Sequence, residues 1–391
     1  MDNSETILGL PDYEITGIER EGKEIRIRVR YTGRIACPDC GGQQLRLKDT
    51  YWRQIRHESW GTRHVFLELL SHKWRCRACG RYFRLQLPGI LRWQRSTEAF
   101  RRQIYQLHWD GINRSRLGQR ENISPATVER HFQHFLRRSA AELKDAACPR
   151  VLGIDEHFFS RRLGFATTFC DLAKHKVYDV VLGRSEASLA SYLAKLRGKE
   201  NVRVVCMDLS AAYRALVVRH FPNALIVTDR FHVIRLISQQ FVAVWRRIDP
   251  VGSKNRGLLS LLRRHASNLR PEQAVKLALY LASHPALAVL YEFRERLNQL
   301  LLLRTQTAKA CRRLAPILLD FIDQLRTSGF LELQSLGHTL DSWKHEVARM
   351  WRFTRNNGIT EGFHTKMEVL QRQAYGFRNF KNYRLRVVVM C

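Results

Sequence analysis

The sequence contains no apolar run of about 20 residues, the length that a membrane-spanning helix needs, and no secretory signal pattern. We therefore expect a cytoplasmic protein that does not associate with a membrane. It also contains no internal repeat and no low-complexity linker. With 391 residues, of which 45% are hydrophobic and 26% are charged, the chain is long enough for two or three folded domains with hydrophobic cores.

Acidic residues are scarce, since 36 Asp and Glu stand against 66 Lys and Arg, and the formal net charge is +30. Such an excess goes beyond what solubility requires and predicts a polyanionic partner, DNA or RNA. Residues 51–150 carry 20 Lys and Arg against 8 Asp and Glu, whereas residues 1–50 carry 8 against 9. Residues 351–391 carry 8 against 2. Arginine dominates both basic stretches, which favours bidentate contacts to phosphate.

The nine cysteines are unevenly distributed. Cys37 and Cys40 form one CxxC motif and Cys76 and Cys79 form a second, with 35 residues between them. Four thiolates in this arrangement predict a tetrahedral structural Zn²⁺ site. A disulfide framework is disfavoured in a reducing compartment, and a redox CxxC motif would not need a matching second pair. The remaining cysteines are interpreted as small apolar residues: Cys148, Cys170, Cys206, Cys311 and Cys391.

Strict alternation of charged and apolar side chains marks residues 24–31 as a half-buried strand. Its apolar face carries Ile25, Ile27, Val29 and Tyr31. Together with the two CxxC motifs, this strand makes residues 1–92 a zinc-binding, ribbon-like domain with a basic outer face.

Residues 93–145 have the pattern of a helix-turn-helix DNA-binding domain. Its last helix should begin at Pro125, with Ser124 as the N-cap. The side chains expected in its core are Val128, Phe132 and Phe135. Those expected on the outer face, where a recognition helix meets the major groove, are Thr127, Arg130 and His134. Any other three-helix bundle is the alternative.

Two aspartates follow short apolar runs of the kind that form buried central strands. Asp155 comes after residues 151–154, and Asp208 comes after residues 202–207. An acid at the tip of a buried strand lies where open α/β folds place their sites. A few carboxylates and a substrate phosphate are the usual ligands of Mg²⁺. Two such ions about 4 Å apart can activate an attacking oxygen and stabilise a leaving one, so the pattern favours phosphodiester chemistry with Mg²⁺ or Mn²⁺.

A third acid, Glu361, opens a predicted helix after the turn-like residues 356–358. The apolar face of this helix carries Phe363, Met367, Leu370 and Ala374. The opposite, polar face carries Glu361, His364, Thr365, Glu368 and Arg372. An ordinary solvated helix face is the alternative to a metal-binding role.

The order of the predicted elements is that of a ribonuclease-H-like fold: three strands, a helix, a strand, a helix and a strand. The strands are expected at 151–154, 165–172, 177–182, 202–207 and 225–228, and the helices at 186–198 and 209–220. The expected fold class is multidomain α/β. A mixed-sheet core formed by residues 146–240 and 355–391 is interrupted by an all-α insertion, residues 241–354, for which a structural bundle or a dimer interface is the alternative. We expect three tryptophans to be buried in the core or at an interface, with stacking on DNA bases as the alternative: Trp245, Trp343 and Trp351.

Several phrases carry a resemblance to a known family. They are CPDCGG and RCRACGRYF near the N-terminus, then GIDE, DLSAAYR, PNALIVTDRFHV and TEG…QRQAYGFRNFKNYRLR. With these phrases the chain resembles the DDE transposases of bacterial insertion sequences, in the ISL three group. The resemblance implies that Asp155, Asp208 and Glu361 form a catalytic triad that binds the Mg²⁺ ions. It leaves Asp229 open as a fourth ligand, a supporting acid or a substrate contact, with His232 as a second accessory residue.

The function that the resemblance implies is DNA transposition. Such an enzyme binds double-stranded DNA at the inverted repeats of the element and at the target, cleaves it and transfers the strand, with water and then a DNA 3′-hydroxyl as nucleophiles. A homo-oligomer in the synaptic complex and a cytoplasmic, nucleoid-associated location in a bacterium are expected. A non-catalytic DNA-binding regulator and a ribonuclease-H-like DNA nuclease or resolvase are the alternatives. An RNA-processing enzyme is disfavoured, because residues 1–150 contain no RNA-recognition module.

Overall fold

The computed structural model describes residues 4–143, 146–353 and 358–391. It divides into two compact units, Met1–Glu142 and Leu143–Cys391. Within the described ranges, no helix combines the length and the apolar character needed to cross a lipid bilayer.

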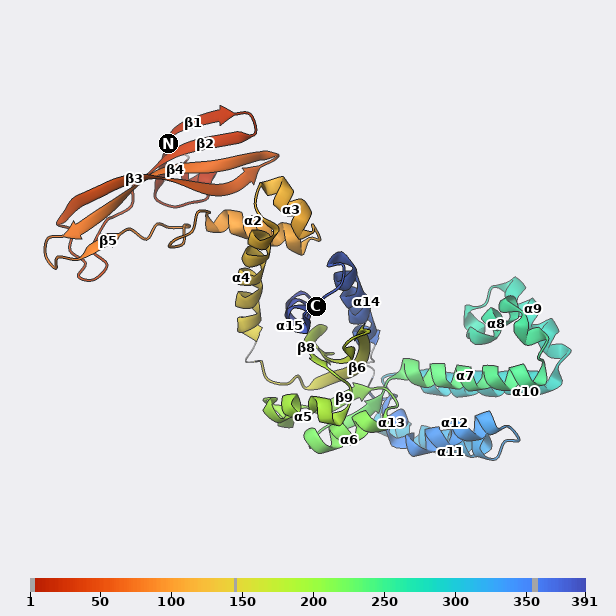
Figure 1. Cartoon of the computed structure of the whole chain (residues 1–391). Coiled ribbons are helices and arrows are strands. Elements are labelled where there is room, and N and C mark those ends of the chain that lie inside the picture. The colour runs from red at the N-terminus through yellow and green to blue at the C-terminus, as the bar shows by residue number, and fades with distance from the viewer. Residues whose placement is uncertain (1–3, 144–145, 354–357) are drawn as a thin grey trace. The chain divides into compact units, whose positions relative to one another are not determined.

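The first unit contains a five-stranded sheet (Figure 1). After the short helix α1 (Ser4–Leu8), its strands are β1 (Tyr13–Glu21), β2 (Glu24–Tyr31), β3 (Leu45–Trp60), β4 (Arg63–Cys76) and β5 (Tyr82–Arg84). The order is β1-β2-β4-β3, with β5 paired to the end of β4. The predicted alternation in residues 24–31 is confirmed, because Ile25, Ile27 and Val29 are buried in the core of this sheet.

Three helices follow the sheet in the same unit: α2 (Glu98–Trp109), α3 (Arg114–Glu121) and α4 (Pro125–Leu143). Helix α4 begins at Pro125, and the Ser124 hydroxyl accepts a hydrogen bond from the backbone N–H of Thr127 at 3.1 Å. The predicted N-cap is therefore confirmed. The three predicted core residues of α4 are buried as expected: Val128, Phe132 and Phe135.

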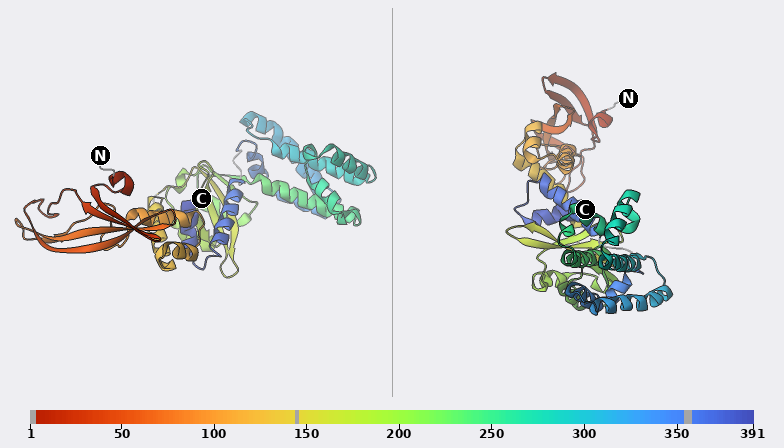
Figure 2. Two further views of the ribbon diagram at one scale, coloured as in Figure 1. Left: turned by 90° about the horizontal axis from the view of Figure 1, so that it is seen from above. Right: turned by 90° about the vertical axis from the view of Figure 1, so that its right-hand side faces the viewer.

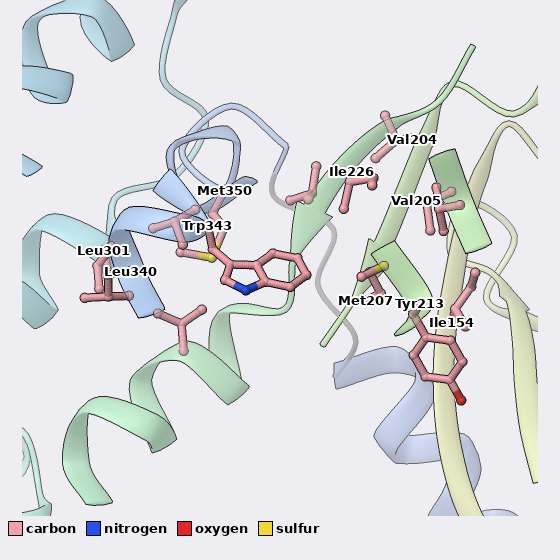
Figure 3. Close-up of a cluster of buried hydrophobic side chains, with 14 of the residues drawn as sticks. Ile154, Val204, Val205, Met207, Tyr213, Ile226, Leu301, Leu340, Trp343 and Met350 are labelled. Atoms are coloured by element: carbon pink, nitrogen blue, oxygen red, sulfur yellow. The ribbon is translucent and has the colours of Figure 1, made fainter. Parts of the chain in front are cut away.

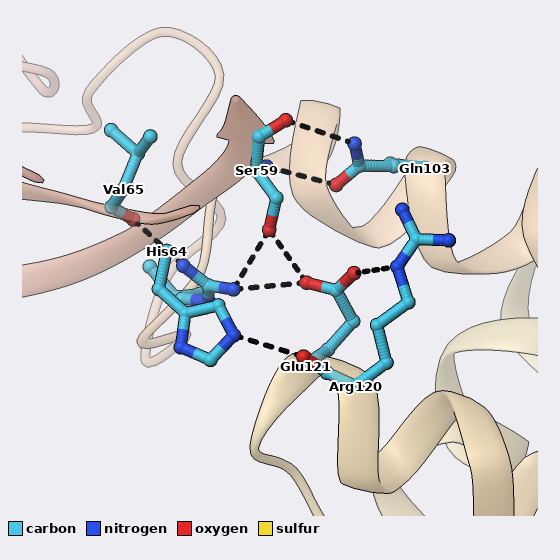
Figure 4. A network of polar contacts seen from close by, with 7 residues as sticks. Ser59, His64, Val65, Gln103, Arg120 and Glu121 are labelled. Carbon is cyan, nitrogen blue, oxygen red and sulfur yellow. Dashed lines mark hydrogen bonds and ion pairs between the residues drawn. The ribbon is translucent and has the colours of Figure 1, made fainter. Parts of the chain in front are cut away.

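A buried polar network attaches these helices to the sheet (Figure 4). The Glu121 carboxylate of α3, 1% exposed, lies 3.0 Å from the Arg56 guanidinium of β3 and accepts a hydrogen bond from the Ser59 hydroxyl at 2.6 Å. Arg56 also donates to the Val65 carbonyl at 3.3 Å, and Gln103 of α2 bonds to the Ser59 backbone. The ribbon and the helices are consequently held together in one compact unit.

The second unit is built on another five-stranded sheet: β6 (Val151–Ser160), β7 (Gly164–Asp171), β8 (Lys176–Leu182), β9 (Val204–Met207) and β10 (Leu225–Thr228). Its order is β10-β9-β6-β7-β8. The first three strands are antiparallel, and β9 and β10 run parallel to β6. Helices α5 (Glu186–Lys195) and α6 (Ala211–His220) interrupt the strands where the sequence predicts helices.

One expectation about β6 is wrong. Asp155 does not follow this strand but lies inside it, because the antiparallel partner β7 continues the pairing from Asp155, opposite Thr168, as far as Ser160. The parallel partner β9 ends earlier, at Met207 opposite Ile154. Asp155 therefore lies at the point where pairing continues on one side of β6 only.

Helices cover both faces of this sheet, with α5 and α6 on one face and α14 (Gly358–Gln373) and α15 (Phe380–Met390) on the other (Figure 1). Ile154 packs in the cluster that includes residues of α5 and α6, whereas Phe159 packs with residues of α14 and α15. Asp155 shares a face with Phe159, because side chains alternate along a strand. The turn expected at residues 356–358 lies outside the described residues, except for Gly358, which begins α14.

The segment between the last strand and α14 is helical, as predicted. Its helices are α7 (Arg230–Ile248), α8 (Arg256–Arg263), α9 (Pro271–Ala282), α10 (Pro285–Leu302), α11 (Ala308–Arg326), α12 (Leu331–Ser342) and α13 (Lys344–Arg349). Helices α7 and α10 lie side by side and carry α8 and α9 at their far end (Figure 1, Figure 2). Short 3-10 turns of this segment lie at Gly252–Lys254 and Ala266–Asn268, and another, Lys199–Asn201, lies between α5 and β9.

The core of the sheet continues into this helical segment. Trp343 and Met350 belong to the same buried cluster as Ile226 of β10 and Met207 of β9 (Figure 3). The Arg349 side chain of α13 also donates a hydrogen bond to the Ile226 carbonyl at 3.0 Å. The three tryptophans of the segment are buried, which confirms them as core residues: Trp245, Trp343 and Trp351.

Candidate functional site

Strand register brings three aspartates to one edge of the second sheet. Ile154 of β6 pairs with Met207 of β9, and Met207 pairs with Thr228 of β10. The next residue in each of these parallel strands is an aspartate: Asp155, Asp208 and Asp229. Three acids from segments far apart in the sequence thus end side by side.

His232, in the first turn of α7, joins two of these acids. Its Nδ1 atom lies 2.8 Å from Asp208 Oδ1 and 2.7 Å from Asp229 Oδ2. Burial disfavours the charged ring, but the close contacts with both carboxylates and their negative charges outweigh it and raise the pKa of His232 to about 10. The ring is therefore an imidazolium that neutralises part of the acidic cluster.

Asp155 lies beside this cluster in a nearly dry position, 8% exposed. Burial and then the nearby charge of Asp208 raise the pKa of Asp155 to about 7, although the backbone N–H of Glu156 donates a hydrogen bond to its carboxylate at 2.8 Å. Clustered carboxylates repel one another, and a hard divalent cation relieves that repulsion with the oxygen ligands it prefers. The donor set at this edge of the sheet therefore fits Mg²⁺ or Mn²⁺.

Glu361 lies outside the acidic cluster, on the exposed first turn of α14. Within the described residues, the group at this edge whose ligand atoms all approach within 4.8 Å consists of Asp208, Asp229 and His232. One helical turn beyond Glu361, however, His364 Nδ1 lies 3.6 Å from Asp155 Oδ2. Residues three apart lie on the same helix face, so α14 directs the side that carries Glu361 toward the aspartates.

A partly buried polar network behind Asp155 was not predicted. The Thr168 hydroxyl of β7 lies 3.1 Å from Nε2 of His364 and 3.0 Å from Nδ1 of His157, and the Tyr383 hydroxyl of α15 lies 2.8 Å from Nε2 of His157. Burial lowers the pKa of both histidines to about 4, so both rings are neutral. His157 stands two residues after Asp155 in a strand, and this spacing is the signal that places both side chains on one face.

The four predicted zinc ligands converge at the end of the first sheet. The Sγ atoms of Cys37 and Cys79 are 3.6 Å apart, as are those of Cys40 and Cys76, and all four lie within 4.8 Å of one another. A tetrahedral site with Zn–S bonds of about 2.3 Å requires sulfur atoms about 3.8 Å apart. The four thiols therefore fit a zinc ion.

The predicted DNA-binding residues lie along α4. Arg130 and His134 are exposed, whereas Thr127 is half-buried and its hydroxyl accepts a hydrogen bond from the Arg130 guanidinium at 2.8 Å. Their relation to DNA stays a prediction.

A four-cysteine zinc module, a large cationic surplus and carboxylates at the ends of parallel strands are together the features of an enzyme that acts on nucleic acid. Comparison with known proteins gives the particular family. Residues 152–387 match the ISL3 transposase family, and residues 33–79 match the zinc finger of the transposases of IS204, IS1001, IS1096 and IS1165. The chain therefore belongs to the ISL3 family of DNA transposases, and its four-cysteine cluster is a structural zinc site.

One relative is similar along nearly the whole chain. The transposase for insertion sequence element IS1001 of Bordetella parapertussis is 24% identical over 381 residues, which cover 94% of this chain and 92% of the relative.

Proposed function

We propose that this transposase binds the ends of its insertion sequence and catalyses metal-dependent DNA cleavage and strand transfer at the edge of the second sheet. The observation that carries the proposal is the strand register, which places Asp155 and Asp208 side by side where β9 ends. The strand order β10-β9-β6-β7-β8, in which β6, β7 and β8 are antiparallel and β9 and β10 run parallel to β6, supports a ribonuclease-H-like core.

The proposed ligands of the divalent metal are Asp155, Asp208 and Glu361. When bound, Mg²⁺ or Mn²⁺ would activate the attacking oxygen and stabilise the leaving oxygen of the phosphodiester. Asp155 approaches from strand β6, Asp208 from the residue after β9, and Glu361 from the first turn of α14. In this proposal a movement of α14 or of the Glu361 side chain completes the ligand set.

Asp229 and His232 are proposed to position Asp208 rather than to contact the reacting atoms. The imidazolium of His232 holds the carboxylates of Asp208 and Asp229 together through a single nitrogen. This contact restrains Asp208, which lies just beyond the end of β9, and compensates its charge. The nucleophiles are water for cleavage and a DNA 3′-hydroxyl for joining, so no covalent bond between protein and DNA is required.

DNA recognition is proposed for the first unit. Residues 1–92 form the zinc domain, and residues 93–145 present Thr127, Arg130 and His134 to the major groove of the inverted repeats. Residues 146–240 and 355–391 form the catalytic core, and residues 241–354 form the helical insertion. Because two ends and a target must meet, the proposal includes a homo-oligomer in the synaptic complex and a site of action at the bacterial nucleoid in the cytoplasm.

The test is a cleavage and strand-transfer assay on DNA that carries the inverted repeats, with Mg²⁺ or Mn²⁺. Glu361→Ala should abolish both activities and leave DNA binding intact. Glu368→Ala is the matched control, because Glu368 lies on the same helix, is exposed and pairs with Arg372 at 3.3 Å. It should behave as the unaltered enzyme does.

The same assay separates the alternatives. Full activity of Glu361→Ala would refute the proposed third ligand and direct attention to Asp229 or, if the Glu368→Ala variant is inactive, to Glu368. Binding without cleavage by the unaltered protein would indicate a regulator, and cleavage without joining would indicate a nuclease.

A further inference from the structure

A large cationic groove lies in the first unit, apart from the proposed recognition helix α4. Its volume is 1230 Å³, and its walls come from the zinc-binding end of the sheet and from the segment of residues 81–95. Eight Lys and Arg side chains line it, and among the described residues that line it Asp39 is the one carboxylate. Asp39 is already paired with Arg81 at 3.4 Å.

Three of the eight cations of the groove stand next to aromatic rings. Arg84 lies over the ring of Tyr51 with its guanidinium carbon 5.1 Å from the centroid, and the Lys73 ammonium lies 5.6 Å from the centroid of Tyr82. Arg92 lies 5.1 Å from the Trp93 ring in the same manner. Cations next to aromatic faces are the surface that nucleic acid strands require, because phosphate meets the charge and a base meets the ring.

Trp93 is the most informative residue of the groove. Its side chain is 74% exposed, and its backbone has φ = +65°, a left-handed conformation that costs a bulky residue on the order of 1–3 kcal/mol. Neighbouring backbone contacts hold it there. The Arg53 guanidinium donates to the Gln94 carbonyl at 3.0 Å, and the Arg56 N–H donates to the Arg95 carbonyl at 2.9 Å. The indole is thus fixed at the surface of a cationic groove, on a strained backbone of the kind found at ligand sites.

We propose that this groove binds a single strand of DNA, with phosphates on Arg84, Arg92 and Lys73 and a base stacked on Trp93. A duplex keeps its base faces stacked against one another, so a ring fixed in a groove can stack on the bases of an unpaired strand only. The inference rests on the proposed function, because cleavage at the element ends is what exposes unpaired strands.

The experiment compares two exposed tryptophans of the same unit. Trp52 on β3 is 62% exposed but does not line the groove, so Trp52→Ala is the matched control for Trp93→Ala. Binding of labelled oligo-dT of about twelve nucleotides to the full-length, zinc-loaded protein is followed by fluorescence anisotropy. The buffer contains neither added divalent metal nor chelator, which keeps the measurement independent of catalysis and preserves the zinc site.

We expect Trp93→Ala to weaken oligo-dT binding about 5- to 150-fold, the effect of removing one stacking platform. Binding of a duplex that carries the inverted repeat should stay within about twofold, and Trp52→Ala should change neither affinity. Equal oligo-dT binding by Trp93→Ala and the unaltered protein would overturn the proposal, whatever the cleavage assay shows. Equal losses on single strand and duplex would instead identify a general duplex surface, and tighter binding of oligo-U would identify an RNA site; either result overturns it.

Discussion

Replacing Cys76 with serine should unfold the zinc-binding end of the first sheet while the rest of that sheet stays folded. Cys76 is fully buried, at 0% exposure, and its Sγ lies 3.6 Å from that of Cys40. The two CxxC turns pack in a small cluster of their own around Phe83, separate from the main core of the sheet. The loss should therefore be local.

The size of the effect follows from the residues that zinc has to order. The two turns, residues 37–42 and 76–81, contain twelve residues, and fixing their backbone costs on the order of 12–24 kcal/mol. Burial of Phe83 returns only about 2–3 kcal/mol. Structural zinc supplies about 10–16 kcal/mol in small zinc modules at neutral pH. The turns should therefore be ordered with zinc and unfolded without it.

Zinc content and limited trypsin digestion test this reasoning together. The unaltered protein should contain one zinc ion per chain at this site, and Cys76→Ser should lose it and be cleaved rapidly at Arg77 and Arg81. Cys311→Ser, a half-buried cysteine of α11 outside the cluster, should keep both zinc and resistance. Stoichiometric zinc and unchanged resistance in Cys76→Ser would refute the argument.

Two further predictions concern the stability of the first unit. Glu121→Ala leaves Arg56 as an uncompensated buried charge and should lower the free energy of unfolding, measured by urea denaturation, by about 3–5 kcal/mol. The control is Glu129→Ala, which breaks the more exposed pair with Arg114 and should lower it by at most about 1 kcal/mol. A cost below about 1 kcal/mol for Glu121→Ala would contradict the role of this network. Burial lowers the pKa of His131 to about 4, so between pH 6.5 and 4 the unfolded chain binds a proton that the folded chain does not, and stability falls as the pH falls. The titration of His131 should account for about 2 kcal/mol of the fall in the free energy of unfolding between pH 7 and 5. Urea denaturation at both pH values should show a smaller fall for His131→Leu than for the unaltered protein, and an equal fall would contradict this assignment.

Local patterns in the sequence were sufficient where neighbouring residues decide the structure. The alternation of residues 24–31, the N-cap Ser124 before Pro125 and the order of strands and helices from residue 151 onward all follow from short-range preferences, and the structure has them. The CxxC spacing predicted the cysteine cluster for the same reason, because each pair is a local turn. Asp155 was wrongly predicted to follow its strand, whereas it lies inside β6, because the length of β6 depends on its partner β7 and not on its own residues.

The sequence by itself determined which residue types are available: the four cysteines, the acids at strand ends and the cationic surplus that requires a polyanion. Only the tertiary structure decided which of them meet. The contact of His232 with Asp208, the sharing of Thr168 by two half-buried histidines, and the lining of one groove by Trp93 and by cationic side chains of β2, β3 and β4 all join residues that local preference cannot relate. The physical reason is that strand register and helix packing set these distances, and both result from burying apolar surface over the whole unit rather than from any short stretch of chain.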